Sequence, residues 1–203
     1  APSTQRLLHQ LYEGLHFVPH DFVFAALICL PLFNAAFGLS YVTLLPIFSD
    51  VYFQTGSAGY GLVNAAHGLG ALAGTLVVAV LATRLRRRGL VILIGAAGMG
   101  LGLVAFSRVP TLGPALPILA AVGFSNTFYL TQVSTQLQQT VPDHLRGRVM
   151  SLYALCWNLL PIGGLLGGLM AAAVDARFAV SVGGAMVAGN ALLLLASRRL
   201  RLL

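Results

Sequence analysis

Charged residues are scarce in this sequence. Asp, Glu, Lys and Arg together make up 8% of its 203 residues, whereas 58% of the residues are apolar. A soluble domain carries about a quarter of its residues as these four charged types, which keep its surface hydrated. The mean hydropathy of +0.87 is strongly positive. The sequence therefore indicates that the lipid bilayer is the main surrounding of this chain.

Lysine is absent, and all twelve basic residues are arginine. We attribute this bias to codon usage in a GC-rich bacterial genome. The formal net charge is +7, but the arginines gather at the ends of apolar segments and no aromatic residues alternate with them. We therefore expect no nucleic-acid partner.

Cysteine is rare, and the two cysteines, Cys29 and Cys156, lie inside apolar runs. We interpret both as small buried hydrophobic residues rather than as a disulfide or a metal site. The sequence also lacks an HExxH motif and a pair of intramembrane aspartates. We expect neither a metal nor a cofactor.

Six uncharged stretches are long enough to cross a bilayer. Each has about 18 or more mostly uncharged residues, and a helix of that length spans roughly 30 Å. The predicted transmembrane helices are Phe22–Phe48, Gly59–Thr83, Leu90–Ser107, Leu112–Gln138, Val149–Val174 and Phe178–Ala196. Pro31 and Pro46 predict a kinked or tilted first helix. The predicted fold class is an all-α membrane protein, with a six-transmembrane-helix bundle over residues 21–197.

The arginine positions predict the orientation of this bundle. Only Arg108 and Arg177 lie in the odd-numbered connections. The other ten lie before the first span, in the second or fourth connection, or in the tail: Arg6, Arg84, Arg86, Arg87, Arg88, Arg146, Arg148, Arg198, Arg199 and Arg201. Positively charged connections stay in the cytoplasm. We therefore expect a multi-pass protein of the bacterial cytoplasmic (inner) membrane with both termini cytoplasmic and a basic tail over residues 198–203.

Residues 1–20 do not read as a signal peptide, because they have no clean apolar stretch and no small-residue cleavage site. Apolar residues at positions 7, 8, 11, 12 and 15 have helical spacing. This spacing predicts a short amphipathic helix on the cytoplasmic surface. The sequence begins with Ala1 rather than methionine, so we expect it to belong to a longer one.

Three motifs carry a resemblance to a known family. They are Glu13-Gly14-Leu15-His16-Phe17-Val18; Gly59-Tyr60-Gly61-Leu62 with the glycine-rich run 68–74 and the basic turn 84–89; and the stretch from Val141 to Ser151. Together they resemble the C-terminal half, spans seven to twelve, of a major facilitator superfamily transporter. The bacterial efflux branch that includes the enterobactin exporter is the most similar.

The resemblance implies that this chain forms one half of the superfamily fold. Its partner would be an N-terminal six-helix half, which this sequence lacks. In such transporters the first, second, fourth and fifth spans of a half line the cavity, and the third and sixth pack outside. Two halves of this kind rock about a site near the middle of the membrane.

Basic turns follow the second and fourth predicted spans. Arg84 and Arg88 lie in the first turn, and Arg146 and Arg148 in the second. We consider two roles for them, topology anchors alone or a latch that bridges helices at a cytoplasmic gate. Asp143 follows a proline, and we favour a role as N-cap of the fifth helix over a role in this gate.

Glycines four residues apart favour close contact between transmembrane helices. The sequence has four such pairs: Gly70 and Gly74, Gly98 and Gly102, Gly163 and Gly167, and Gly164 and Gly168. Four pairs in one short chain predict tight packing inside the bundle.

Uncharged polar residues become informative in spans with so few charges. His67 is the one His, Asp, Glu, Lys or Arg near the middle of a predicted span, and Asn64 and Tyr60 precede it on the same helix face. We favour a cavity-lining role for this face. An interhelical hydrogen bond, or a proton-coupling role for the imidazole, are the alternatives.

The second half of the fourth predicted span is polar from residue 125 to 136, and such polarity cannot all face lipid. We predict a substrate-facing strip of Asn126, Tyr129 and Gln132 at three-residue spacing. Further cavity candidates come from the first and fifth spans: Asn34, Tyr41, Tyr153, Trp157 and Asn158. Amide and aromatic side chains without a buried charge favour a hydrophobic or amphipathic substrate, with an aromatic compound as one option, over a sugar phosphate or a free ion.

The leading functional hypothesis is secondary active transport by alternating access, most simply efflux of a small molecule such as a drug or a siderophore. An intramembrane protease is an alternative, but Gly123-Phe124-Ser125-Asn126 lacks the final glycine of the nucleophile turn. A channel or non-transporting membrane scaffold is the other, although no filter-like run is present. We therefore do not expect an enzyme.

Overall fold

The computed structural model describes residues 22–81, 87–141, 143–197 and Leu200. The side chains of residues 81, 143–145 and 148 are outside this description. The predicted amphipathic segment 1–20, Arg84 and all of the tail 198–203 except Leu200 also lie outside the described residues.

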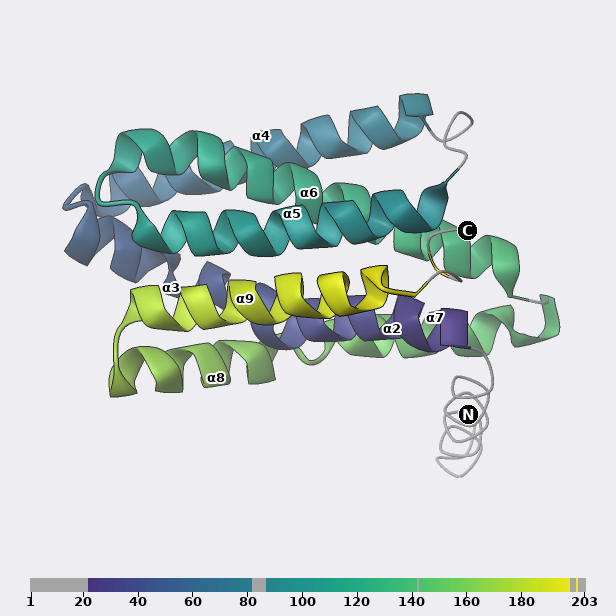
Figure 1. The fold of residues 1–203 in the computed structure, drawn as a ribbon. Coiled ribbons are helices and arrows are strands. Elements are labelled where there is room, and N and C mark those ends of the chain that lie inside the picture. The colour runs from purple at the N-terminus through teal and green to yellow at the C-terminus, as the bar shows by residue number, and fades with distance from the viewer. Residues whose placement is uncertain (1–21, 82–86, 142, 198–199, 201–203) are drawn as a thin grey trace, which may run out of the picture.

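The described residues form a helical bundle of six spans (Figure 1). The first span runs through α2 (Phe22–Phe33), η2 (Asn34–Gly38), α3 (Ser40–Ile47) and η3 (Phe48–Tyr52), and the fifth through α7 (Asp143–Trp157) and α8 (Leu160–Ala173). The others are single helices: α4 (Gly56–Leu81), α5 (Arg88–Arg108), α6 (Leu112–Thr140) and α9 (Ala176–Leu195). The predicted all-helical six-span fold class is confirmed.

Five of the six spans are long and apolar enough to cross a membrane by length and composition alone. The span that is not among them is α6, whose C-terminal half carries the polar stretch 125–136. A helix with so many amides and hydroxyls needs neighbours or water on its polar faces, because lipid cannot satisfy those groups. We therefore expect a functional site next to α6.

The first span contains two π-helical segments, and each follows a proline. Pro31 precedes η2 and Pro46 precedes η3. Proline has no N–H to donate and crowds the carbonyl four residues earlier, so the helix cannot continue unchanged. The wider turns keep the backbone bonded: the Leu39 N–H donates to the Asn34 carbonyl at 2.8 Å. The span therefore continues through both prolines.

The fifth span is interrupted between α7 and α8. The Asn158 N–H donates to the Leu155 carbonyl at 3.0 Å, and the Leu159 N–H to Cys156 at 3.2 Å. These are tight turns three residues long. Pro161 follows at the start of α8, where its fixed φ suits a new helix. Trp157 is therefore the last residue of α7, directly before the interruption.

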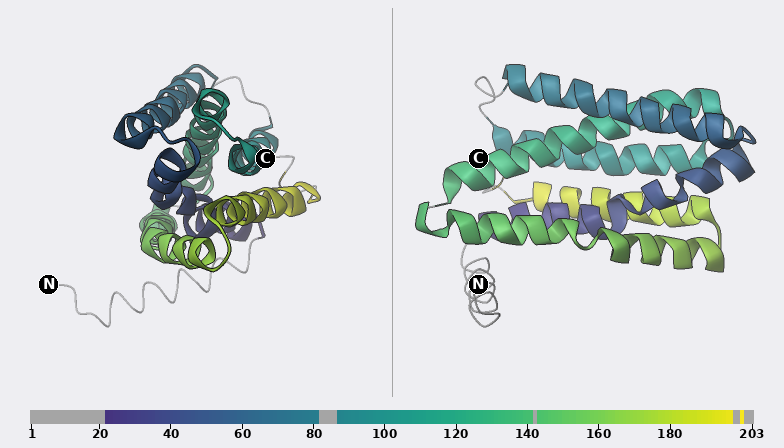
Figure 2. Two further views of the ribbon diagram at one scale, coloured as in Figure 1. Left: turned by 90° about the vertical axis from the view of Figure 1, so that its left-hand side faces the viewer. Right: turned by 180° about the vertical axis from the view of Figure 1, so that it is seen from behind.

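The helices pack in a definite order. α4 lies along α6, and α5 lies between α6 and α9 (Figure 1). α3 and α9 both contact α8. The chain runs along the bundle six times, so α2 begins and α9 ends at the same end. The connection from α6 to α7 lies at this end too (Figure 2).

Glycine allows the close approach of α4 to α6. A methyl group on Gly70 would lie 1.8 Å from the carbonyl oxygen of Ala120, and one on Gly74 would lie 2.7 Å from that of Phe124. In α6, a methyl group on Gly123 would lie 2.1 Å from the carbonyl oxygen of His67. No side chain fits in these contacts, so the two backbones touch.

Other glycine pairs make similar contacts. A methyl group on Gly163 of α8 would lie 2.4 Å from the carbonyl oxygen of Ala35, and one on Gly167 would lie 2.8 Å from Cβ of Ser40. Gly168 is different, because nothing lies within 4 Å of the place its methyl group would take. The spacing thus identifies contact faces, although not every member of a pair makes a contact.

Burial is uneven among the spans. In the most apolar 18-residue stretch of α5, half is buried inside the chain. In the corresponding stretches of α4 and of the α7–α8 span, only 22% is buried. The exposed face of α4 carries large apolar side chains, with Leu69 67% exposed and Leu76 59% exposed. Lipid or another protein segment must cover these faces.

Candidate substrate-binding site

A polar hollow of about 460 Å³ lies between α6 and α7. Its lining residues are Asn126, Thr127, Leu130, Thr131, Ser134, Thr135, Gln138, Tyr153 and Trp157. Seven of these nine come from one face of α6, where their spacing of three and four residues places them together. None of the nine is charged, so this wall offers hydrogen bonds and aromatic contact rather than ion pairing.

The α6 wall satisfies part of its hydrogen bonding within the helix. The Thr135 hydroxyl donates to the Thr131 carbonyl at 2.8 Å. Gln138 Nε2 donates to the Ser134 hydroxyl oxygen at 3.1 Å. Each hydroxyl oxygen still keeps lone pairs, so the wall can accept hydrogen bonds from a ligand.

The α7 wall is aromatic. Tyr153 is half-buried, and Trp157 is 41% exposed. Both belong to α7, one turn apart. Flat rings of this kind stack on apolar or aromatic ligands. The hollow thus combines one hydrogen-bonding wall with one aromatic wall.

A buried hydrogen bond ties the first span to this hollow. Asn34 Nδ2 donates to Asn126 Oδ1 at 3.0 Å, and the two side chains are only 1% and 8% exposed. Asn34 opens the π segment η2, and Gly38 leaves room for it, because a methyl group there would lie 2.3 Å from Asn34 Oδ1. π turns of this kind are frequent at functional sites.

Tyr129 and Gln132 lie on another face of α6. Tyr129 is fully buried against α5, where a methyl group on Gly95 would lie 2.8 Å from its Cβ. Gln132 is 3% exposed. Among the described residues, neither the Tyr129 hydroxyl nor Gln132 Nε2 has a hydrogen-bond partner. Of the three residues of the predicted strip, Asn126 alone lines the hollow.

Tyr41 and His67 form a second group, between the first span and α4. Their rings meet edge to face with centroids 5.9 Å apart. Tyr41 is 1% exposed, whereas His67 is half-buried. The Tyr41 hydroxyl and His67 Nε2 are both buried without a partner in the described part of the chain. Buried polar atoms of this kind are normally satisfied by water or a ligand.

The remaining predicted cavity residues lie at the surface of this chain. Tyr60 is 39% exposed, and Asn64 is exposed with its Nδ2 donating to the Tyr60 carbonyl at 2.8 Å. Asn158 is exposed at the interruption between α7 and α8. Tyr60, Asn64 and His67 share α4, but only His67 reaches toward another span.

Basic side chains contact the last turn of α6. The Arg88 guanidinium donates to Gln139 Oε1. Arg146 Nε donates to the Gln138 carbonyl at 3.1 Å. Cations are favourable at the C-terminus of a helix. Through these two bonds, the second and the fourth connection between spans both contact the same end of α6. Of the other predicted gate residues, Asp143 and Arg148 fall in α7, with side chains outside the description, and Arg84 lies outside the described residues.

Comparison with known proteins identifies the family. The profile of a transmembrane secretion effector family of the major facilitator superfamily matches residues 2–202. The chain belongs to this superfamily. It is therefore a multi-pass membrane protein of a transporter family rather than an enzyme, and the fold described above is a major facilitator fold.

One curated relative is the multidrug efflux pump Tap of Mycolicibacterium fortuitum. It is 30% identical over 171 residues, which cover 83% of this chain but 41% of the relative. The chain therefore spans less than half the length of this transporter.

The polar stretch 125–136 was expected to line the pore as a whole, but several residues of the hollow were not named as single candidates. They are Thr127, Leu130, Thr131, Ser134, Thr135 and Gln138. The signal was present, because residues 127, 131 and 135 carry hydroxyls at steps of four residues, a little more than one helical turn each. Among the described residues, no three His, Cys, Asp or Glu side chains lie close enough to hold a metal ion.

Proposed function

We propose that this chain is the C-terminal six-span half of a secondary active transporter that exports a small amphipathic molecule across the bacterial cytoplasmic membrane. The observation that carries the proposal is the neutral hollow between α6 and α7 in a chain of the major facilitator superfamily. A multidrug efflux pump among its relatives supports the direction of transport. Alternating access would expose the hollow to each side in turn.

The exposed faces support a missing partner half. α4 and the α7–α8 span are the least buried of the five apolar spans, and the relative is more than twice as long as the matched region. An N-terminal six-helix half would cover these faces and supply the opposite wall of the hollow. Tyr60, Asn64 and Asn158, which are exposed in this chain, would then face that half.

The substrate class follows from the lining. About 460 Å³ is within the usual range of roughly 300–1,000 Å³ for small-molecule pockets. Hydroxyl and amide groups on one side and Tyr153 and Trp157 on the other suit an uncharged aromatic compound with a few polar groups, such as a drug or a siderophore. A free ion or a sugar phosphate would find no counter-charge among these lining residues.

The arginine contacts at the end of α6 support a cytoplasmic gate. Arg88 and Arg146 bridge different connections to the end of α6, and we propose that Arg84, Asp143 and Arg148 belong to the same cytoplasmic gate. Bonds of this kind would form in one conformation of the transport cycle, where they hold α6 in place, and break in the other. Among the described residues near the middle of a span, His67, with the unpartnered Tyr41 hydroxyl beside it, is where a proton would be taken up if transport is proton-coupled.

Dye efflux tests the proposed site. In the transporter assembled from this chain and its N-terminal half, Tyr153→Leu removes one ring of the aromatic wall. We expect the apparent affinity for a neutral aromatic dye to fall about three- to tenfold, in keeping with the loss of one aromatic contact. Leu155→Ala is the matched control, because Leu155 is exposed on the same helix but does not line the hollow. Equal loss in both variants would argue against the hollow as the substrate site.

A further inference from the structure

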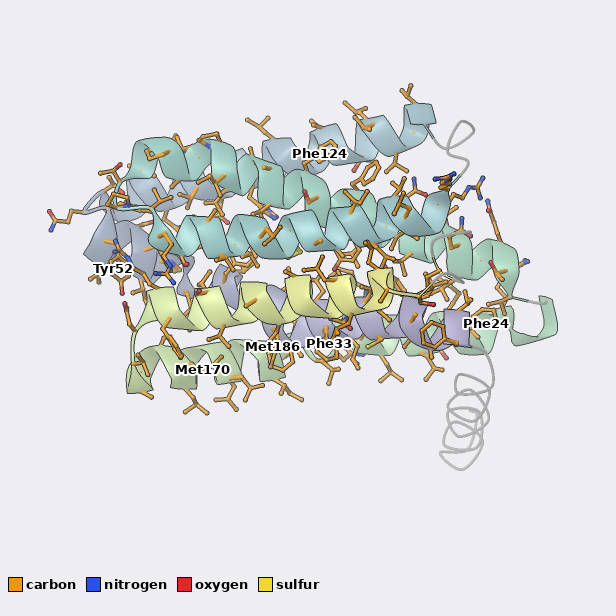
Figure 3. The ribbon with its side chains drawn as sticks, in the orientation of Figure 1. Phe24, Phe33, Tyr52, Phe124, Met170 and Met186 are labelled. Carbon is orange, nitrogen blue, oxygen red and sulfur yellow. The ribbon has the colours of Figure 1, made fainter. Side chains whose placement is uncertain are left out.

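A second recess lies at the opposite end of the bundle from Arg88 and Arg146. It has a volume of about 310 Å³ and is lined by Ser107, Arg108, Asp175, Arg177, Phe178 and Ser181. α5 ends and α9 begins here (Figure 1), and Tyr52 lies at the same end (Figure 3). It is separate from the hollow between α6 and α7, with which it shares no lining residue.

Arg177 lies over an aromatic ring at this recess. Its guanidinium carbon lies 4.3 Å from the centroid of the Tyr52 ring. A cation over the face of an aromatic ring is attracted to it without using a hydrogen-bond donor. Its Nε is buried and has no partner among the described residues. A donor is therefore buried at the recess without an acceptor.

Asp175 leaves the start of α9 without a side-chain cap. It is the N-cap residue of α9, but its side chain makes no capping hydrogen bond. The carboxylate instead accepts a hydrogen bond from the Tyr52 hydroxyl. An aspartate at this position usually accepts from the first-turn amides. With Asp175 engaged elsewhere, the positive end of the helix is open to another anion.

The charge of the lining is positive. Arg108 and Arg177 carry two positive charges against one negative charge on Asp175, and Arg108 is exposed. Ser181 adds a half-buried hydroxyl. Two guanidinium groups, a hydroxyl and a helix N-terminus are the donors that a phosphate group prefers.

Apolar surface leads away from this recess. Leu101 and Ile94 precede Arg108 by seven and fourteen residues, so they lie on the same face of α5, and each is 57% exposed. On α9, Phe178 at the rim is 47% exposed, and Met186 farther along is 44% exposed. A ligand with a phosphate at one end and hydrocarbon at the other fits this arrangement.

We propose that this recess binds the phosphate of a membrane phospholipid. Arg108 and the edge of Arg177 donate to the phosphate oxygens, together with the free amides at the start of α9. The acyl chains lie against the exposed apolar faces of α5 and α9. The recess lies at the end of two membrane-crossing helices, where phospholipid headgroups are found, so the bilayer supplies this ligand directly.

Native mass spectrometry tests the proposal on the chain purified in a neutral detergent. Titration with phosphatidylglycerol should give a saturable adduct, and Arg108→Gln should weaken its binding about tenfold, as expected for one charge-assisted contact. Arg87→Gln is the matched control, because it removes an exposed arginine at the opposite end and should leave the adduct unchanged. Diacylglycerol, which lacks the phosphate, should give no comparable adduct.

Three results would overturn the proposal. One is equal retention of phosphatidylglycerol by the wild type and Arg108→Gln. Another is equal binding of diacylglycerol, which would show that the acyl chains alone are recognised. The third is binding of inorganic phosphate that depends on Arg108 while lipid retention does not, which would assign the recess to a soluble anion. Arg108 carries the test because it is exposed, so its substitution should leave the fold intact.

Discussion

At the scale of single residues, the buried amide pair is the central polar contact. Asn34 and Asn126 are 92 residues apart in the sequence and are joined by a hydrogen bond of 3.0 Å. Both were predicted as cavity residues, because an amide in an apolar span needs a polar surrounding. Their contact with each other was not predicted, since sequence periodicity places a residue on a helix face but not opposite a partner.

A double-mutant cycle on this pair measures the contact. Asn34→Ala and Asn126→Ala should each destabilise the chain, and the two together should lose less than the sum, with a coupling energy of about 0.6–1.7 kcal/mol. Unfolding in mixed micelles provides the free energies. The control pair is Asn34→Ala with Asn64→Ala, because Asn64 bonds its own helix. Additivity in both pairs would contradict the role of the bond.

Residue spacing alone did not predict which face of α6 lines the hollow. A three-residue step turns a helix by about 300°, so a strip at 126, 129 and 132 drifts about 120° around α6. Thr127, Thr131 and Thr135, at four-residue steps, stay nearer one face, and these line the hollow. Because α6 is polar on more than one side, its sequence alone does not say which polar face is open and which is buried against α5.

At the scale of helices, the six spans could be predicted almost completely. Long uncharged runs end at arginines and prolines, and the observed spans begin and end within a few residues of the predicted ones, except that η3 and the start of α7 extend farther. Pro161 predicted a bend in the fifth span, but the π segments and the exact place and form of the interruption at 158–159 could not be predicted. A proline in a membrane helix can be accommodated by a kink, a π turn or a break, and tertiary packing selects among them.

The glycine contact between α4 and α6 can be tested with two neighbouring glycines of α4. Gly70→Ala should destabilise the chain by about 1–3 kcal/mol, because its methyl group would collide with the Ala120 carbonyl. Gly68→Ala is the control, since nothing lies within 4 Å of its methyl position. Thermal unfolding in detergent measures both. Equal midpoints for the two variants would refute close contact of the backbones at Gly70.

At the scale of the whole molecule, the orientation in the membrane follows from charge. Arg87, Arg88 and Arg146 lie at one end of the bundle and Arg108 and Arg177 at the other. The excess of arginine at the first end predicts that it faces the cytoplasm.

Cysteine labelling tests this orientation at the two ends of one helix. In a background with Cys29 and Cys156 replaced by alanine, Thr111→Cys and Thr140→Cys place one thiol before α6 and one at its last residue, and both threonines are exposed. A membrane-impermeant maleimide should label residue 111 in intact cells and residue 140 only after permeabilisation. The reverse pattern would invert the proposed topology.

The most direct test of the central claim is transport by the reconstituted halves. Proteoliposomes with this chain alone, and with this chain plus the proposed N-terminal six-helix half, are loaded with a neutral aromatic dye and followed for efflux. We expect saturable flux only when both halves are present, because the hollow between α6 and α7 needs an opposite wall. Saturable flux at full rate from this chain alone would contradict its role as half of a transporter.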